Sequence, residues 1–282
     1  MLTTVRAGPY TLRGLSVAGL QTSLFVRELN VLFDVGIAAR STAGADHIFL
    51  SHGHADHCGA LVTLLGMRGL MRLPAAHVFL PSELEDSTRQ AIALFSRGQR
   101  HDFAVTLHPM SPGDERALRP DLSVRAFRTH HTGPSLGYQF FSRVQKLKAM
   151  HLGLPSSEIA ERRRRGDDLF DDAERLLLAY ATDTRVSVLD ATPSLLETPV
   201  LILECSFLDE RKTIEATHAG GHIHLDELLA RSSSFDNQAL VLMHFSQMYA
   251  PSEVRRILAQ RCPSELMRRI VVFAPESGAW PG

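Results

Sequence analysis

Cysteine is scarce in this chain of 282 residues, which has only Cys58, Cys205 and Cys262 and no CxxC pair. That number and spacing exclude a disulfide framework and fit thiols that stay reduced, as they do in a cytosol. Cys58 adjoins a histidine-rich stretch and could be a metal ligand, although a buried free thiol is the commoner role for such a residue. The cysteines therefore predict a cytoplasmic protein.

An excess of charge of either sign is also missing, because 30 Lys and Arg face 31 Asp and Glu, for a formal net charge of −1. A nucleic-acid partner would need a local basic patch, since no general basic surface is available. No apolar run reaches membrane length, and the best one breaks at Arg68. Arg6, Gly8 and Pro9 interrupt any signal-peptide pattern at the start. We expect a soluble protein with no membrane partner.

Internal repeats and low-complexity linkers are absent too, so residues 1–282 are expected to form a single domain. Apolar residues make up 44% of the chain, enough for a large core. Alternating and continuous apolar runs predict a mixed α/β fold, with helices outside the sheets. Strands are expected at 15–17, 22–26, 31–34, 47–50, 77–80, 103–108, 115–118, 122–128, 176–181, 199–204, 240–243 and 270–273. Helices are expected at 59–67, 82–95, 223–231 and 251–260, the second of them capped by Ser82 with Glu85 three residues on.

Histidine is plentiful, and four candidate metal ligands fall in one short stretch: His52, His54, Asp56 and His57. The stretch follows a short buried strand and precedes a helix, so it lies on a loop at the carboxyl edge of a sheet. Imidazole and carboxylate groups suit zinc and similar ions. In extended chain His52 and His54 point the same way, whereas Asp56 and His57 lie past the bend. One loop can therefore serve two neighbouring metals. A merely capping role is disfavoured by this density of ligands.

Other expected strands end in polar residues at what should be the same edge of a sheet, where sites are commonly built. These strand ends are Asp183, Glu204, His244 and the pair His130-His131. Each is weak by itself, since a lone strand-end aspartate is more often a cap. Asp34 ends another strand and is either an ordinary turn residue or a carboxylate that holds a ligating histidine. Anchored by the 52–57 stretch, the set can hold two adjacent metals with one bridging carboxylate.

Residues 143–170 differ from the rest of the chain. Basic residues, including the run Arg162 to Arg165, alternate with acidic ones, and Gly153, Pro155 and Gly166 break the pattern. We expect an inserted, largely exposed segment. A solvated helix face is the ordinary explanation of such an arginine run, and contact with RNA phosphates is the alternative.

His52-Gly53-His54-Ala55-Asp56-His57 matches the HxHxDH signature of the metallo-β-lactamase superfamily. Further motifs resemble the tRNA 3′-processing endonuclease family, ribonuclease Z. They are His131 placed before Gly137-Tyr138, Thr182-Asp183-Thr184, Glu204-Cys205-Ser206-Phe207, Gly221-His222-Ile223-His224 and His244-Phe245-Ser246. The segment 143–166 resembles the plant-type short form. Thr182 stands where the family has glycine, and the Gly-Pro-rich flexible arm of many bacterial members is absent.

The resemblance implies an αββα sandwich of two mixed β-sheets flanked by helices. It also implies two Zn²⁺ per chain, with Mn²⁺ as the alternative ion. One zinc would be held by His52, His54 and His131, the other by Asp56, His57 and His244, and Asp183 would bridge them. The family spacing selects His131 over His130.

For the reaction, the resemblance implies that Asp56 orients the attacking water and that His222 protonates the leaving oxygen, with Glu204 as its partner. The implied substrate is precursor tRNA, cut to remove its 3′ trailer by a cytoplasmic homodimer. Hydrolysis of a small phosphodiester, lactone or thioester is the alternative activity. A non-catalytic RNA-binding member ranks last, since such a member should lack ligands.

Overall fold

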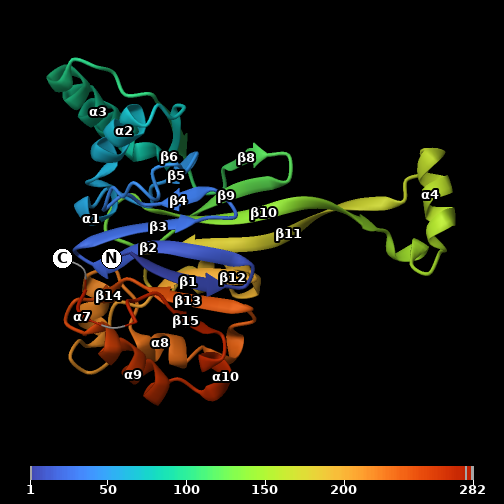
Figure 1. Cartoon of the computed structure of the whole chain (residues 1–282). Coiled ribbons are helices and arrows are strands. Elements are labelled where there is room, and N and C mark those ends of the chain that lie inside the picture. Colours follow the sequence, from blue (N-terminus) through green and yellow to red (C-terminus); the bar gives the residue numbers. More distant parts are fainter. Residues whose placement is uncertain (1, 277, 281–282) are drawn as a thin grey trace.

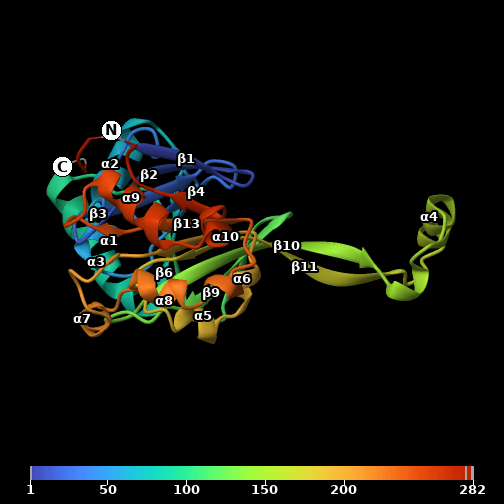
Figure 2. The same ribbon diagram turned by 90° about the horizontal axis from the view of Figure 1, so that it is seen from below.

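The structure is a computed structural model that describes residues 2–276 and 278–280. Two β-sheets lie face to face, and helices cover their outer faces (Figures 1 and 2). The expected αββα sandwich of two mixed sheets is confirmed. No helix in the described part of the chain is long and apolar enough to cross a membrane.

The first sheet has the order β1-β2-β3-β4-β5-β6-β7, with β14 paired to β2. Its strands are β1 (Thr3–Ala7), β2 (Tyr10–Ala18), β3 (Gln21–Val26), β4 (Val31–Phe33), β5 (His47–Phe49), β6 (Ala76–Pro81), β7 (Val105–Met110) and β14 (Phe245–Ser246). The second sheet has the order β15-β13-β12-β11-β10-β9-β8. Its strands are β8 (Glu115–Arg119), β9 (Leu122–Arg128), β10 (Leu136–Leu147), β11 (Phe170–Ala181), β12 (Val200–Glu204), β13 (Ala239–Met243) and β15 (Ile270–Val272).

The helices fall into two layers and an outlying tip. The α-helices are α1 (Ala55–Cys58), α2 (Leu61–Leu70), α3 (Glu85–Gln99), α4 (Ser156–Arg164), α5 (Val188–Ala191), α6 (Ser194–Glu197), α7 (Ile214–Ala219), α8 (Leu225–Leu229), α9 (Pro251–Arg261) and α10 (Ser264–Met267). Short 3₁₀ turns are η1 (Ser82–Leu84), η2 (Ala149–His151) and η3 (Ser232–Ser234). In Figure 1, α2 and α3 lie over the first sheet, and α8, α9 and α10 lie over the second.

The prediction that Ser82 caps the helix at 82–95 is wrong. Ser82 begins the 3₁₀ turn η1, and its hydroxyl donates to the Glu83 carboxylate. Helix α3 starts only at Glu85, behind Leu84, which gives it no side-chain cap. The 3₁₀ turn therefore takes the place that the Ser82 cap was expected to fill.

Aromatic side chains join the two sheets. Phe33 from the first sheet stacks on Tyr180 from the second, with ring centres 4.2 Å apart, and meets Phe140 edge-on. These rings are fully buried. Burial of each such side chain contributes roughly 1.5–3 kcal/mol to folding. Tyr180 is the next-to-last residue of β11, so this packing also fixes the strand end that leads to Asp183.

Strands β10 and β11 extend out of the body as an antiparallel hairpin, with α4 at its tip (Figures 1 and 2). We call residues 143–170 the arm. The inner parts of both strands are buried in the second sheet, whereas the arm residues are mostly half-buried or exposed. The chain thus has a projecting arm although the family's Gly-Pro-rich one is absent from the sequence. It leaves the body on the side away from α1 and α7 (Figure 1).

Candidate metal centre

Parallel strands bring the candidate residues to one edge. β4 and β5 run parallel in the first sheet, as do β11, β12 and β13 in the second. Their carboxyl ends therefore point to the same side. The loop after β5 carries the histidine-rich stretch, and Asp183 and His244 follow β11 and β13. All seven predicted metal ligands meet here.

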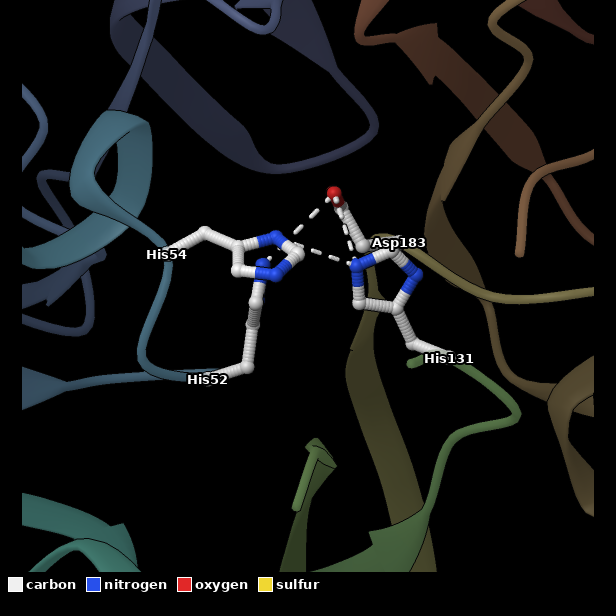
Figure 3. Close-up of side chains that lie close together, drawn as sticks. All are labelled: His52, His54, His131 and Asp183. Atoms are coloured by element: carbon white, nitrogen blue, oxygen red, sulfur yellow. Dashed lines mark hydrogen bonds and ion pairs between the residues drawn. The ribbon is translucent and has the colours of Figure 1, made fainter. Parts of the chain in front are cut away.

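Asp183 lies at the middle of the centre. Its Oδ2 atom is 3.7 Å from Nε2 of both His52 and His131. The Nε2 atom of His131 is 3.2 Å from Nδ1 of His54. These four side chains point toward one another (Figure 3) and form the first ligand group.

The other oxygen of Asp183 faces a second group. Its Oδ1 atom is 3.3 Å from Nε2 of His57 and equally far from Nε2 of His244. Asp56 completes the group, with Oδ2 3.5 Å from Nε2 of His57. One carboxylate thus presents one oxygen to each group, which is the arrangement of a bridge between two ions.

The donors fit divalent metal ions of zinc size. The buried Nε2 atom of His52 has no hydrogen-bond partner within residues 2–276 and 278–280. An unpaired buried nitrogen is costly, and a bound cation would satisfy it. Ligands about 2.0–2.1 Å from a tetrahedral zinc lie about 3.3–3.4 Å apart, close to the spacings found here. Burial, with further lowering from neighbouring histidines, brings the pKa of His52 to about 2, so its imidazole is in the neutral, ligating form.

Hydrogen bonds on the far ring nitrogens aim the histidines at the centre. Nδ1 of His57 donates to Oδ2 of Asp34 at 2.8 Å, and Nδ1 of His131 donates to the carbonyl of Gly221 at 3.2 Å. Each leaves Nε2 free for a metal. Asp34 therefore holds a candidate ligand, which settles the two roles that the sequence left open. Tyr180 in turn donates to Asp34 at 2.6 Å.

Serine hydroxyls orient two further histidines, His52 and His244, whose Nε2 atoms face the centre. Nδ1 of His52 is 2.9 Å from Oγ of Ser51, and Nδ1 of His244 is 3.1 Å from Oγ of Ser206. Ser206 lies in the Glu204-Cys205-Ser206-Phe207 motif and Ser51 precedes the histidine-rich stretch, but neither role as a partner of a histidine was predicted. Gly221 also belongs to a motif. Its φ is +74°, and a Cβ there would lie 2.6 Å from Nδ1 of His131, so only glycine fits.

Three residues at strand ends have left-handed backbone: Asp34, Asp183 and His244, with φ of 53°, 45° and 59°. Such conformations cost roughly 1–3 kcal/mol each for non-glycine residues. They turn the chain sharply as it leaves its strand. Thr182, which stands in place of the family glycine, donates its hydroxyl to Oδ1 of Asp183 at 2.8 Å. The strain thus coincides with the residues that build the centre.

His222, which is partly buried, and the fully buried Glu204 form a pair beside the centre. Nδ1 of His222 donates to Oε1 of Glu204 at 3.0 Å. His222 shares a cluster with Asp183 and His244. Burial acts to lower its pKa, but the charge and hydrogen bond of Glu204 outweigh this and raise the pKa of His222 to about 9. The pair can therefore hold a proton on the imidazole near the metal centre.

Other candidates lie outside the centre. The His130 backbone N–H donates to Oγ1 of Thr184, and its ring nitrogen Nδ1 is 2.5 Å from Oγ of Ser187. Cys58 donates its thiol to the Gly53 carbonyl and belongs to no ligand group in the described residues. Arg162 to Arg165 lie on and just after α4, at the arm tip. The structure therefore does not bring the arginine run to the metal centre of the same chain.

Comparison with known proteins agrees with this geometry. The family described as the beta-lactamase superfamily domain matches residues 22–245. The chain is 30% identical to tRNase Z TRZ1 of Arabidopsis thaliana over 247 residues, covering 87% of this chain and 88% of that protein. It is 39% identical to the nuclear ribonuclease Z of Triticum aestivum over 150 residues, covering 53% of this chain and 85% of that protein.

Solved structures show the same fold. The crystal structure of human tRNase Z, short form, superposes with a TM-score of 0.60 at 16% identity and covers 94% of this chain and 97% of that one. The metallo-beta-lactamase fold protein YhfI from Bacillus subtilis gives a TM-score of 0.61 at 12% identity, with 97% and 95% covered. The chain belongs to the metallo-β-lactamase superfamily and, within it, to the tRNase Z (ribonuclease Z) family.

Proposed function

We propose that the chain is a zinc-dependent endoribonuclease that cuts the 3′ trailer from precursor tRNA. The observation that carries the proposal is Asp183, whose two oxygens each face a separate group of nitrogen ligands beside the His222–Glu204 pair. The names of the relatives, tRNase Z and ribonuclease Z, support the RNA substrate. Two adjacent ions suit in-line displacement at a phosphodiester.

Under this proposal one zinc is held by His52, His54 and His131, and the second by Asp56, His57 and His244. Asp183 bridges the two. Mn²⁺ is the alternative ion for the same ligands. When bound, such a pair supplies a water-derived nucleophile at neutral pH and offsets negative charge on the phosphoryl oxygens.

The chain's own residues handle the protons. The imidazoles of His57 and His244 lower the pKa of Asp56 far below its usual range, against the effect of burial, so Asp56 stays a carboxylate that can orient water. His222 donates its proton to the leaving 3′-oxygen, and the Glu204 carboxylate holds the ring in place and charged. Glu204 is fixed by the backbone N–H of Thr184 at 2.7 Å.

The decisive experiment incubates the purified protein with a 3′-extended precursor tRNA and maps the new ends. We expect a tRNA that ends in a 3′-hydroxyl and a trailer with a 5′-phosphate. A chromogenic phosphodiester should be assayed beside it, because turnover of the diester alone would support a small-substrate hydrolase instead. No cleavage of the tRNA, with fast turnover of the diester, would contradict the proposal.

Adjacent histidines provide an internal test of the ligand assignment. His131→Ala should lose zinc and nearly all activity, because Nε2 of His131 faces Asp183. His130→Ala should keep both, because the His130 ring lies against Ser187. Metal content and precursor cleavage are measured in both variants. An active His131→Ala protein beside an inactive His130→Ala protein would put the assignment wrong by one residue.

We further propose that the arm tip binds the body of the tRNA, in a cytoplasmic homodimer. Figure 1 places α4 at the arm tip and α1, which carries Asp56 and His57, toward opposite ends of the molecule, so the tip suits a tRNA held by a second copy. Helices α2 and α3 also expose Leu70, Leu94 and Phe95, of which 89%, 59% and 57% is accessible. Exposed apolar patches of this kind are common at subunit contacts.

Changing Arg162 to Arg165 together to alanine should weaken binding of precursor tRNA and flatten its salt dependence. The effect should come mainly from Arg163 and Arg164, because Arg162 and Arg165 already pair with glutamates at 2.5 Å and 3.9 Å. Turnover of the small diester should not change, since the metal centre is remote. Binding is measured by fluorescence anisotropy over a range of salt concentrations. Unchanged affinity and slope would make the arginines ordinary solvated charges.

A further inference from the structure

Arg185 lies beside the metal centre, two residues after Asp183. Its backbone N–H donates to the His130 carbonyl at 3.1 Å, and its side-chain Nε donates to the His218 carbonyl at 3.1 Å. The same His218 carbonyl accepts the backbone N–H of Gly221 at 3.0 Å. The guanidinium therefore lies at the base of the turn that carries His222. Its outer nitrogens make no hydrogen bond to the described residues.

A second cation lies near the same histidine. Nζ of Lys212 is 5.3 Å from the centre of the Phe207 ring, and the Phe207 ring meets the His222 ring edge-on at 6.3 Å. Phe207 thus contacts both residues and links the Lys212 ammonium group to the surroundings of His222.

Within the described part of the chain, Arg185 and Lys212 lack the carboxylate partners that the nearby Arg211 has. Arg211 pairs with Asp209 at 2.8 Å and with Glu253 at 3.0 Å. Within residues 2–276 and 278–280, no carboxylate comes within 4.0 Å of the Arg185 or Lys212 cation. A cation held in place by a carbonyl but left without a counter-charge is suited to an anionic ligand. The planar guanidinium fork matches a phosphate in particular.

We infer that Arg185, assisted by Lys212, binds the substrate phosphate one position 5′ of the scissile phosphate. The assignment of side rests on the proposed function. If His222 protonates the leaving 3′-oxygen, groups next to His222 face the nucleotide that carries this oxygen. The 5′-phosphate of that nucleotide is the nearest anion on that side. Arg185 is thus a positioning residue for the substrate strand, distinct from the remote arm arginines.

The test uses precursor tRNA joined from two pieces, so that one chosen phosphate is a neutral methylphosphonate. At the position 5′ of the scissile phosphate, the change should lower kcat/KM of the wild-type protein about tenfold to a hundredfold, the scale of a charge-assisted hydrogen bond. Arg185→Ala should show a similar loss on the normal substrate and little further loss on the modified one. A methylphosphonate 3′ of the scissile phosphate should lower kcat/KM by the same factor in both proteins.

Salt dependence gives a second readout that a structural role would not move. Arg185→Ala and Lys212→Ala should each lower the slope of log affinity against log salt by about one. Arg185→Lys should restore the slope but only part of the rate, since lysine keeps the charge and loses the fork. Arg256→Ala, at an exposed position of α9, is the matched control and should change neither.

The inference would be overturned if the methylphosphonate 5′ of the scissile phosphate lowered kcat/KM equally in the wild-type and Arg185→Ala proteins. It would also be overturned if the effect of Arg185→Ala depended only on the phosphate 3′ of the scissile one. Metal content and melting temperature of each variant show whether it is folded. If the wild-type protein does not cleave precursor tRNA, the proposed function itself is contradicted, and this result is known before any variant is made. Cleavage by the wild type with no coupling at Arg185 leaves the proposed function standing and removes only this subsite.

Discussion

His54→Ala should lose bound metal and about a thousandfold or more of the activity, without unfolding. The reason is that His54 is an exposed loop residue whose ring, among the described residues, contacts the centre alone, where its Nδ1 is 3.2 Å from Nε2 of His131. Removing it takes away a ligand and no core packing. A bound metal supplies several kcal/mol of stabilisation to a phosphoryl transition state.

Elemental analysis, turnover of precursor tRNA and a thermal melt test this expectation together. His101→Ala is the matched control, because His101 is exposed and belongs to no ligand group of the described residues. It should behave as the wild type. Full metal content and activity in His54→Ala would show that the 52–57 loop is not the metal site.

The second large effect is expected at His222. His222→Ala should keep both metals and its affinity for precursor tRNA, but cleave roughly a hundredfold or more slowly, the usual scale for losing proton transfer. The pair with Glu204 holds the imidazole charged and beside Asp183. A sugar 3′-oxygen is a poor leaving group unless it receives a proton.

Comparing two substrates makes this test specific. A nitrophenolate leaving group needs no proton, so His222→Ala should lose far less activity on a chromogenic diester than on precursor tRNA. Equal losses on both would contradict the role of acid. Loss of zinc from the variant would mean that His222 is a ligand instead.

Much of the centre could be predicted because the local sequence around its residues is enough to identify them. The 52–57 stretch holds enough ligands to predict a metal site by itself. Asp183 and His244 follow continuous apolar strands, which are typical of buried parallel sheets. The hydrogen-bond partners could not be predicted in the same way. Ser51 adjoins the histidine-rich stretch and Ser206 lies in a motif, but their contacts with ring nitrogens, and that of Tyr180 with Asp34, are defined only by the folded chain.

The arm shows another limit. Its composition predicted exposure, but not a hairpin, because its outer strands carry no apolar alternation. Their pairing brings basic residues opposite acidic ones, as in Arg143 opposite Glu174 and Lys146 opposite Asp171. That match appears only when the two strands are set side by side. The Ser82 cap failed for a related reason, since a cap motif cannot tell an α-helix from the 3₁₀ turn before it.

The arm also bears on how this fold can change. Among the described residues, none from 143 to 168 belongs to the three hydrophobic core clusters. Insertions and deletions are tolerated where few buried contacts are lost. The arm can therefore be lengthened, shortened or exchanged while the sandwich and its strand ends stay the same. Under the proposed function, substrate reach and catalytic chemistry are encoded in separable parts of the chain, so the first can diversify without loss of the second.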